Sequence, residues 1–304
     1  MAVYKRTYRR YVGGLTPEWS RFSILTRFAL EEMYKSRFLT VFFLVSMIFP
    51  LLAGFFIYLQ HNLSALALIG VDATDPRQII SVDARFFLNF LGIQSMLAFF
   101  FAAFTGPGLI SPDLAHNGLP LYLARPFSRT EYVLGKICVL WLLFSIMTWI
   151  PGFILFGLEW SYQTPEWFAS NSHAIGALFL GAWIWILFLS LLSLALSAWV
   201  RWKPIAGALL FGVFFVAAGF GAAINAVMRT NWGHLLNISH LIGSVWVSMF
   251  QGPESMRRGA GAAFFRVARG EEIPIWACWV ALLAICGFCL FLLSKKIRGV
   301  EVVR

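Results

Sequence analysis

Long apolar runs, separated by short clusters of charged residues, form the main pattern along the chain. Six runs contain no charged residue except Lys136 near the start of the third, and they cover residues 38–59, 86–110, 132–156, 174–200, 204–228 and 273–293. An α-helix rises about 1.5 Å per residue, so each run is long enough to cross the roughly 30 Å hydrocarbon core of a bilayer. The pattern therefore predicts six membrane spans.

Each run is continuous, which favours helices over the strands of a barrel. Barrel strands would appear as segments of about ten residues with alternating polarity. With 60% hydrophobic residues, 12% charged residues and a mean hydropathy of +0.76, the chain also differs from soluble domains, in which about a quarter of residues are charged. We expect an all-α polytopic membrane protein, with residues 1–37 as a cytoplasmic tail and residues 38–304 as a single transmembrane domain.

The basic residues indicate how the spans are oriented. With six spans both termini lie on one side, and if that side is cytoplasmic it receives 17 of the 24 lysines and arginines, against 7 on the other side. The positive-inside rule favours this arrangement. We expect a multi-pass protein of the cell inner membrane with both termini in the cytoplasm. Anionic lipids and the orientation rule account for the net charge of +10, so no nucleic-acid partner is needed.

The segment before the first run has the pattern of an amphipathic helix. It contains no apolar core of signal-peptide type, so we expect no cleaved signal. Thr16 and Pro17 are suited to begin a helix, and Arg27, Glu31 and Lys35 are spaced to pair along its polar face. We predict a helix lying at the cytoplasmic membrane surface. Its apolar positions are Trp19, Phe22, Leu25, Phe28 or Ala29, and Met33.

The segment between the second and third runs carries several helix signals. Gly106-Pro107-Gly108 predicts either a kink or a plain end of the second span. Ser111 can cap a short helix that begins at Pro112 and ends near Gly118 and Pro120. Ser128 and Glu131 form an S-x-x-E capping box, which predicts the start of the third span.

The loop of about 44 residues before the last run offers two interpretations. Residues 231–250 are uncharged but contain two histidines and several serines. Leu235, Ile238, Leu241 or Ile242, Val245 and Met249 share one helical face, which indicates a short re-entrant or interfacial helix on the exoplasmic side. A seventh crossing is the alternative, but it would place Lys295, Lys296 and Arg298 outside the cell, against the charge rule.

Few residues suggest chemistry on this chain. The five histidines (His61, His116, His173, His234, His240) are predicted in loops, and the cysteines (Cys138, Cys278, Cys286, Cys289) fall in predicted spans. We interpret the C-x-x-C pair at 286 and 289 as packing residues, and we expect no catalytic residue, metal site or bound cofactor. Aromatic residues reach 17%, which fits either core packing or a lining for a lipid-like substrate.

The chain also lacks the loop that binds nucleotide phosphates. No G-x-x-x-x-G-K-[ST] sequence is present, because Gly135-Lys136 lacks both the earlier glycine and the following hydroxyl. If ATP drives the protein, another chain must bind it.

The segment Pro120-Leu121-Tyr122-Leu123-Ala124-Arg125-Pro126-Phe127-Ser128-Arg129, followed by Tyr132 and Gly135-Lys136, resembles the loop after the second span in type 2 ABC transporter permeases. The six spans, the amphipathic amino-terminal helix and the long last exoplasmic loop are similar to that family as well. The resemblance implies a homodimer or heterodimer of such subunits carrying two ATPase subunits, which bind ATP and magnesium. It also implies that residues 111–123 form the coupling helix that contacts the ATPase. The residues expected at this contact are Pro112, Asp113, Leu114, Leu119, Leu121, Tyr122 and Arg125.

The function expected from the residues and the resemblance together is that of a permease subunit, without enzymatic activity of its own. It would export a substrate by alternating access, driven by separate ATPase subunits. Two alternatives stay open. One is a membrane enzyme or assembly factor that acts on lipids, and the other is a channel or scaffold that works without nucleotide.

Overall fold

The computed structural model describes residues 20–62, 81–116, 128–250, 265 and 273–296. All regular secondary structure in these ranges is helical. Six helical segments are long and apolar enough to cross a membrane: Arg37–Gln60, Ala84–Ala115, Arg129–Tyr162, Pro165–Trp199, Lys203–Met228 and Ile275–Lys296. Each overlaps one of the predicted runs, so the all-α fold with six helices able to span a membrane is confirmed within the described residues.

Several of these segments consist of two helices in sequence. The elements are α1 (Arg21–Tyr34), α2 (Arg37–Gln60), α4 (Ala84–Thr105), α5 (Pro107–Ala115), α7 (Arg129–Met147), α8 (Trp149–Tyr162), α9 (Pro165–Asn171), α10 (His173–Trp199), α11 (Lys203–Met228), the 3-10 helix η3 (Trp232–Leu236), α12 (Ile238–Met249) and α14 (Ile275–Lys296).

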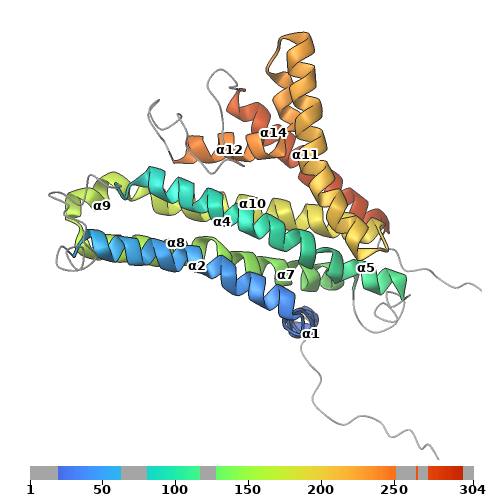
Figure 1. Ribbon diagram of the computed structural model, residues 1–304. Helices are drawn as coiled ribbons and strands as arrows, with labels where there is room; N and C mark the ends of the chain where they lie inside the picture. Colours follow the sequence, from blue (N-terminus) through green and yellow to red (C-terminus); the bar gives the residue numbers. More distant parts are fainter. Residues whose placement is uncertain (1–19, 63–80, 117–127, 251–264, 266–272, 297–304) are drawn as a thin grey trace, which may run out of the picture.

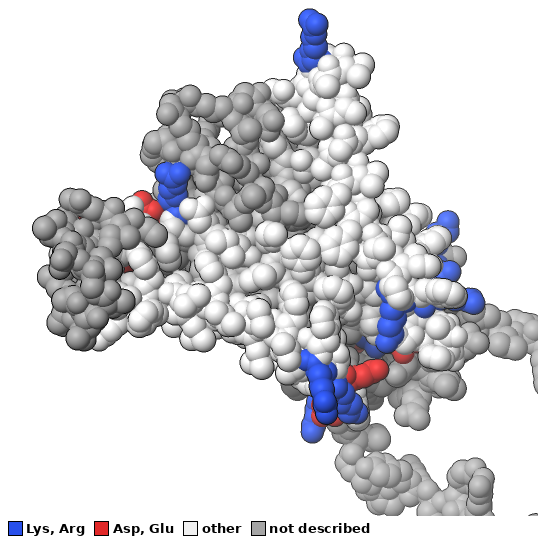
Figure 2. Space-filling view, viewed as in Figure 1, with Lys and Arg blue, Asp and Glu red and all other residues white. Residues whose placement is uncertain are grey.

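The helices form a bundle with two distinct ends (Figure 1). Helices α2, α4, α7–α8 and α10 lie side by side, while α11 rises obliquely away from them. Helices α1 and α5 lie at one end of the bundle, called here the α1 end, and α9 lies at the opposite end, called the α9 end. Charged side chains gather near α1 and α5, whereas the broad face between the two ends is almost free of charge (Figure 2). Such a face suits hydrocarbon surroundings.

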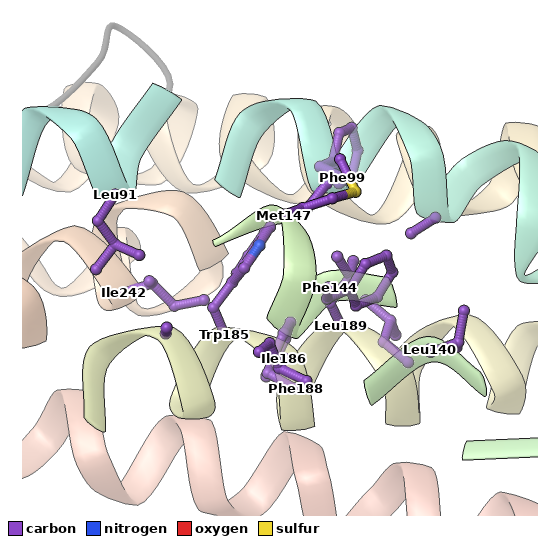
Figure 3. Close-up of a cluster of buried hydrophobic side chains, with 14 of the residues drawn as sticks. Leu91, Phe99, Leu140, Phe144, Met147, Trp185, Ile186, Phe188, Leu189 and Ile242 are labelled. Carbon is purple, nitrogen blue, oxygen red and sulfur yellow. The ribbon is translucent and has the colours of Figure 1, made fainter. Parts of the chain in front are cut away.

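The core is formed mainly by α4, α7, α10 and α12. Phe99, Phe144, Trp185 and Ile242 converge from these four helices (Figure 3) and are fully or almost fully buried. Trp246 fixes α12 on α10, because its indole Nε1 donates a 2.9 Å hydrogen bond to the carbonyl oxygen of Gly181. The core therefore joins the bundle to the segment that follows α11.

The predicted helical face is confirmed only within α12, because Leu235 lies in η3 and Asn237 separates the two helices. Ile238, Leu241, Ile242 and Val245 all lie on α12 and are at most 3% exposed. With 12 residues, α12 is about 18 Å long, too short to cross a bilayer.

Helix α11 and η3 form a hairpin whose crossing point needs two glycines. A Cβ atom on Gly221 would lie 2.2 Å from the carbonyl oxygen of Gly233, and one on Gly233 would lie 2.3 Å from that of Gly221. The amide of Gly233 donates a 2.7 Å hydrogen bond to Asn225 Oδ1. Between Gly221 and Gly233 in the chain, Arg229 ends α11 in the left-handed conformation with φ 49°. The close backbone contact holds η3 against the last turns of α11.

The prediction that Ser111 caps a helix beginning at Pro112 is wrong. Helix α5 begins at Pro107, so that Gly106-Pro107 separates two consecutive helices and Pro112 lies inside the second. Ser111 is fully buried, and its hydroxyl lies 2.6 Å from the carbonyl oxygen of Val200. A tertiary contact with the end of α10 has replaced the local cap.

The third span also differs from its prediction, since it is longer and is broken. It continues to Tyr162, six residues beyond the predicted end, and Thr148 separates α7 from α8. The Thr148 hydroxyl donates a 2.7 Å hydrogen bond to the carbonyl oxygen of Phe144, and Pro151 has no amide hydrogen to continue the helical pattern. The break lies halfway along the span.

Candidate functional site

A carboxylate at the α1 end joins α5 to α7. Asp113 Oδ2 accepts a 2.6 Å hydrogen bond from the hydroxyl of Tyr132 and lies 3.1 Å from Nζ of Lys136. Tyr132 is fully buried, and the side chains of Lys136 and Asp113 are only 9% and 18% exposed. We call these three residues the Asp113 cluster.

The spacing of Tyr132 and Lys136 explains how α7 presents both groups to Asp113. Residues four apart lie on the same face of a helix, and Nζ of Lys136 lies 5.7 Å from the centre of the Tyr132 ring. A buried charge is costly unless it is paired and hydrogen-bonded. The pair therefore favours one position of α5 relative to α7.

The residue next to Lys136 holds α1 on another face of α7. The hydroxyl of Thr26 donates a 2.9 Å hydrogen bond to the carbonyl oxygen of Gly135. A Cβ atom on Gly135 would lie 3.0 Å from both Leu25 Cβ and the carbonyl oxygen of Phe22, which is closer than nearly all real Cβ contacts. Because Gly135 has no side chain, α1 packs directly on the α7 backbone.

Two serines connect α5 to α10. The hydroxyl oxygen of Ser197 accepts hydrogen bonds from the amides of Ile110 and Ser111, at 3.2 and 3.0 Å. Ser111 and Ser197 are both fully buried. Helix α5 is thus bonded to α7 through the carboxylate of Asp113, and to α10 through the backbone amides of Ile110 and Ser111.

The structure describes part of the predicted coupling segment. Pro112, Asp113 and Leu114 lie in the last turn of α5 and are partly buried, whereas Leu119, Leu121, Tyr122 and Arg125 lie outside the described residues. The capping box is confirmed, because Ser128 Oγ accepts from the amide of Glu131 at 3.2 Å and Glu131 Oε2 accepts from the amide of Ser128 at 2.6 Å. It begins α7 one turn before Tyr132.

The amino-terminal helix has the predicted pattern where it is described. In α1, Leu25, Ala29 and Met33 are buried, and Phe28 is 65% exposed. Ala29 rather than Phe28 therefore belongs to the packed face. Arg27 and Glu31 pair at 2.9 Å. The predicted start at Thr16 and Pro17 lies outside the described residues.

Sequence reasoning missed a second polar cluster, at the α9 end. The carboxylate of Glu159 in α8 is fully buried and lies 3.2 Å from Nε2 of His61, the residue that ends α2. Gln163 Nε2 donates a 2.5 Å hydrogen bond to Glu159 Oε1, and the His61 ring stacks on Tyr162 with centres 4.9 Å apart. Glu159 was missed because the third apolar run seemed to end at Phe156.

The predicted loop positions of the histidines are partly wrong. His240 lies in α12 and is 3% exposed, and its ring stacks on that of His234 with centres 4.6 Å apart. His173 is the first residue of α10. Within the described ranges, no group of three or more His, Cys, Asp or Glu side chains could hold a metal ion.

A comparison with protein-family models finds no match, and a search of curated proteins finds no significant relative.

Proposed function

We propose that the chain is the membrane-spanning subunit of a type 2 ABC transporter, driven by ATPase subunits that are separate chains. The observation that carries the proposal is the Asp113 cluster. It ties the helix expected to contact the ATPase to α7, and the neighbouring Gly135 ties α7 to α1.

The distribution of basic residues supports a cytoplasmic α1 end. Four stretches of the chain, residues 1–37, 125–136, 201–203 and 295–304, carry 17 of the 24 lysines and arginines. The positive-inside rule then directs the α1 end toward the cytoplasm, as expected for a protein of the inner membrane with both termini inside. An ATPase in the cytoplasm would reach α5 from that side.

The contacts of α5 suggest how a movement of the ATPase would enter the membrane. A force on Leu114 would pass through Asp113 to α7 and through Ser111 to α10. Packed helices with a few strong polar contacts transmit such a displacement better than a freely hinged loop. Alternating access by a pair of permease subunits, in the direction of export, is the action we assign to this linkage.

The remaining helices fit this arrangement. Helix α1 would lie at the cytoplasmic interface, where exposed apolar residues such as Ile24 and Phe28 could enter the headgroup layer. Helix α12 would be a re-entrant helix on the exoplasmic side, since it is apolar, short and packed between α10 and α14.

Reconstitution in liposomes tests the proposal. The chain would be purified together with a P-loop ATPase that co-purifies with it from native membranes, and ATP hydrolysis and transport would be measured for wild type and for Leu114→Ala and Asp113→Ala. We expect both variants to reduce coupled ATP hydrolysis by about 2- to 30-fold, the range that corresponds to about 0.5–2 kcal/mol of coupling. Glu166→Gln, at an exposed position of α9, is the control and should have no effect.

Three results would contradict the proposal. The first is ATP hydrolysis by the purified chain without a partner. The second is passage of a solute at full rate without nucleotide, as for a channel. The third is an activity on lipids that persists without any ATPase and is lost when loop histidines and acidic residues are replaced, as for a membrane enzyme.

A further inference from the structure

A groove of about 810 Å³ opens beside α1, and the functions considered above do not use it. Helix α1 forms one side, and residues of α7, α8 and α10 form the other. The volume lies within the range of about 300–1,000 Å³ that is typical of sites for small molecules. The groove extends from α1 to the break at Thr148, since both Ser145 and Trp149 line it.

The wall of the groove that faces α1 is mainly apolar. Its residues on α7, α8 and α10 are mainly Trp141, Leu142, Ile146, Trp149, Ile150 and Trp183. The rings of Trp141 and Trp183 meet edge to face with centres 5.6 Å apart, which gives a stiff aromatic surface. Leu142 is 50% and Ile146 40% exposed. In a membrane-spanning chain, such a wall would lie open to the acyl chains of the bilayer.

The α1 side of the groove includes the apolar side chains of Phe22 and Leu30, and it also carries both signs of charge. Ser23, Arg27 and Glu31 are each four residues apart, and Tyr34 lies one turn further along the helix. The Arg27 and Glu31 side chains are 82% and 50% exposed and pair with each other at 2.9 Å. The α1 side of the groove thus offers a cation and an anion, whereas the facing side is mainly apolar, with Cys138 and Ser145 as its small polar side chains.

We propose that this groove binds one zwitterionic phospholipid of the bilayer, with an acyl chain along α7 and α8, its phosphate at Arg27 and its ammonium group at Glu31. Arginine forms strong charge-assisted hydrogen bonds to phosphate, and Glu31 neutralises the ammonium group. A phospholipid with a net negative headgroup would meet the same arginine, but Glu31 would repel it. The paired charges therefore distinguish this site from the general attraction of a basic surface for anionic lipid.

The inference requires only that the chain lies in a bilayer, so it holds or fails separately from the proposed transport function. A lipid in this position would contact α1 and α7 together. It would stabilise the packing of α1 by mass action.

Native mass spectrometry of the full chain in detergent, after delipidation, tests the proposal. Phosphatidylethanolamine and phosphatidylglycerol with identical acyl chains would be titrated separately. We expect one phosphatidylethanolamine to bind with about fivefold preference, because one exposed charge interaction contributes up to about 1 kcal/mol. Glu31→Gln should abolish the preference, and Arg27→Gln should weaken the binding of both lipids.

A matched pair of variants tests whether the groove itself is occupied. Leu142→Trp places a large ring at the mouth of the groove, and Leu283→Trp makes the same change on α14, where Leu283 is 67% exposed and the groove is distant in the fold. Both positions are on exposed surface, so we expect both variants to fold, with helix content checked by circular dichroism. Leu142→Trp should reduce the binding of phosphatidylethanolamine at least about threefold, and Leu283→Trp should not change it.

Two outcomes would overturn the proposal. Equal binding of both lipids to wild type would show that the paired charges do not select a zwitterion. Equal binding by Leu142→Trp and Leu283→Trp would show that the lipid lies elsewhere on the surface.

Discussion

Nζ of Lys136 lies 3.1 Å from Oδ2 of Asp113, and both side chains are largely withdrawn from solvent. Lys136 is also the one charged residue within the six predicted apolar runs. Burying a lysine in this position costs little free energy of folding only when a partner of opposite charge neutralises it. The pair thus accounts for the lysine, and it defines the position of α5 on α7.

The first prediction concerns the coupling energy of this pair. Asp113→Asn and Lys136→Met should each destabilise the protein by about 2–3 kcal/mol, because each leaves a largely buried charge without its partner. The double variant should lose less than the sum, with a coupling energy of about 1–3 kcal/mol. Unfolding in detergent, followed by circular dichroism, measures all four proteins.

The exposed pair of Arg27 and Glu31 provides the control cycle. Its coupling energy should be only about 0.3–0.5 kcal/mol, since the two residues are four apart on one helix and their side chains are 82% and 50% exposed. Additive losses at Asp113 and Lys136 would show that the two charges do not interact.

The second prediction concerns the packing of α1. Gly135→Val should destabilise the protein by about 1–3 kcal/mol, because the new side chain would collide with Leu25 and the backbone of Phe22. We expect protease cleavage within α1 to become faster as the helix leaves α7. Gly157→Val on α8, where a Cβ atom would meet nothing within 4 Å, is the control. Equal effects of the two variants would contradict the close packing of α1.

The third prediction concerns the hairpin of α11 and η3. Gly233→Ala should separate the two segments, because its methyl group would meet the backbone of Gly221 and the side chain of Asn225. We expect a loss of at least about 2 kcal/mol, measured by thermal unfolding. Gly219→Ala, two residues before Gly221 and with open space around its Cβ position, should stabilise α11 by up to about 1 kcal/mol. A neutral Gly233→Ala would show that the backbones are further apart.

The fourth prediction concerns the buried carboxylate at the α9 end. Glu159→Leu should destabilise the protein by about 2–4 kcal/mol, because His61 and Gln163 both lose their hydrogen-bond partner. Glu159→Gln retains an acceptor oxygen and should cost less. The exposed Glu166→Gln is the control and should change the stability by less than about 0.5 kcal/mol. A tolerated leucine at position 159 would indicate that the polar cluster does not join α2 to α8.

The sequence was sufficient to predict features that depend on local pattern. The six apolar segments follow from hydrocarbon thickness, the cap at Ser128 follows from a four-residue signature, and the buried face of α12 follows from helical periodicity. Each involves residues that are close in the chain.

Features that depend on distant partners could not be predicted. Ser111 resembled a cap, but Ser197 and Val200, more than 80 residues away, bind it instead. Glu159 lies beyond the predicted end of the third span, and its partner His61 is 98 residues earlier in the chain. The one local signal for the Asp113 cluster was Lys136 itself, an isolated charge in an apolar run.

Photocrosslinking from the end of α5 tests the proposed function most directly. Ala115, exposed in the last turn of α5, would be replaced by p-benzoylphenylalanine, and crosslinked partners in native membranes would be identified by mass spectrometry. The same replacement at Ser170, exposed on α9, would serve as the control. The proposed function predicts a crosslink from position 115, but not from position 170, to a chain that carries G-x-x-x-x-G-K-[ST]. A folded protein whose position 115 reaches no such chain would contradict it.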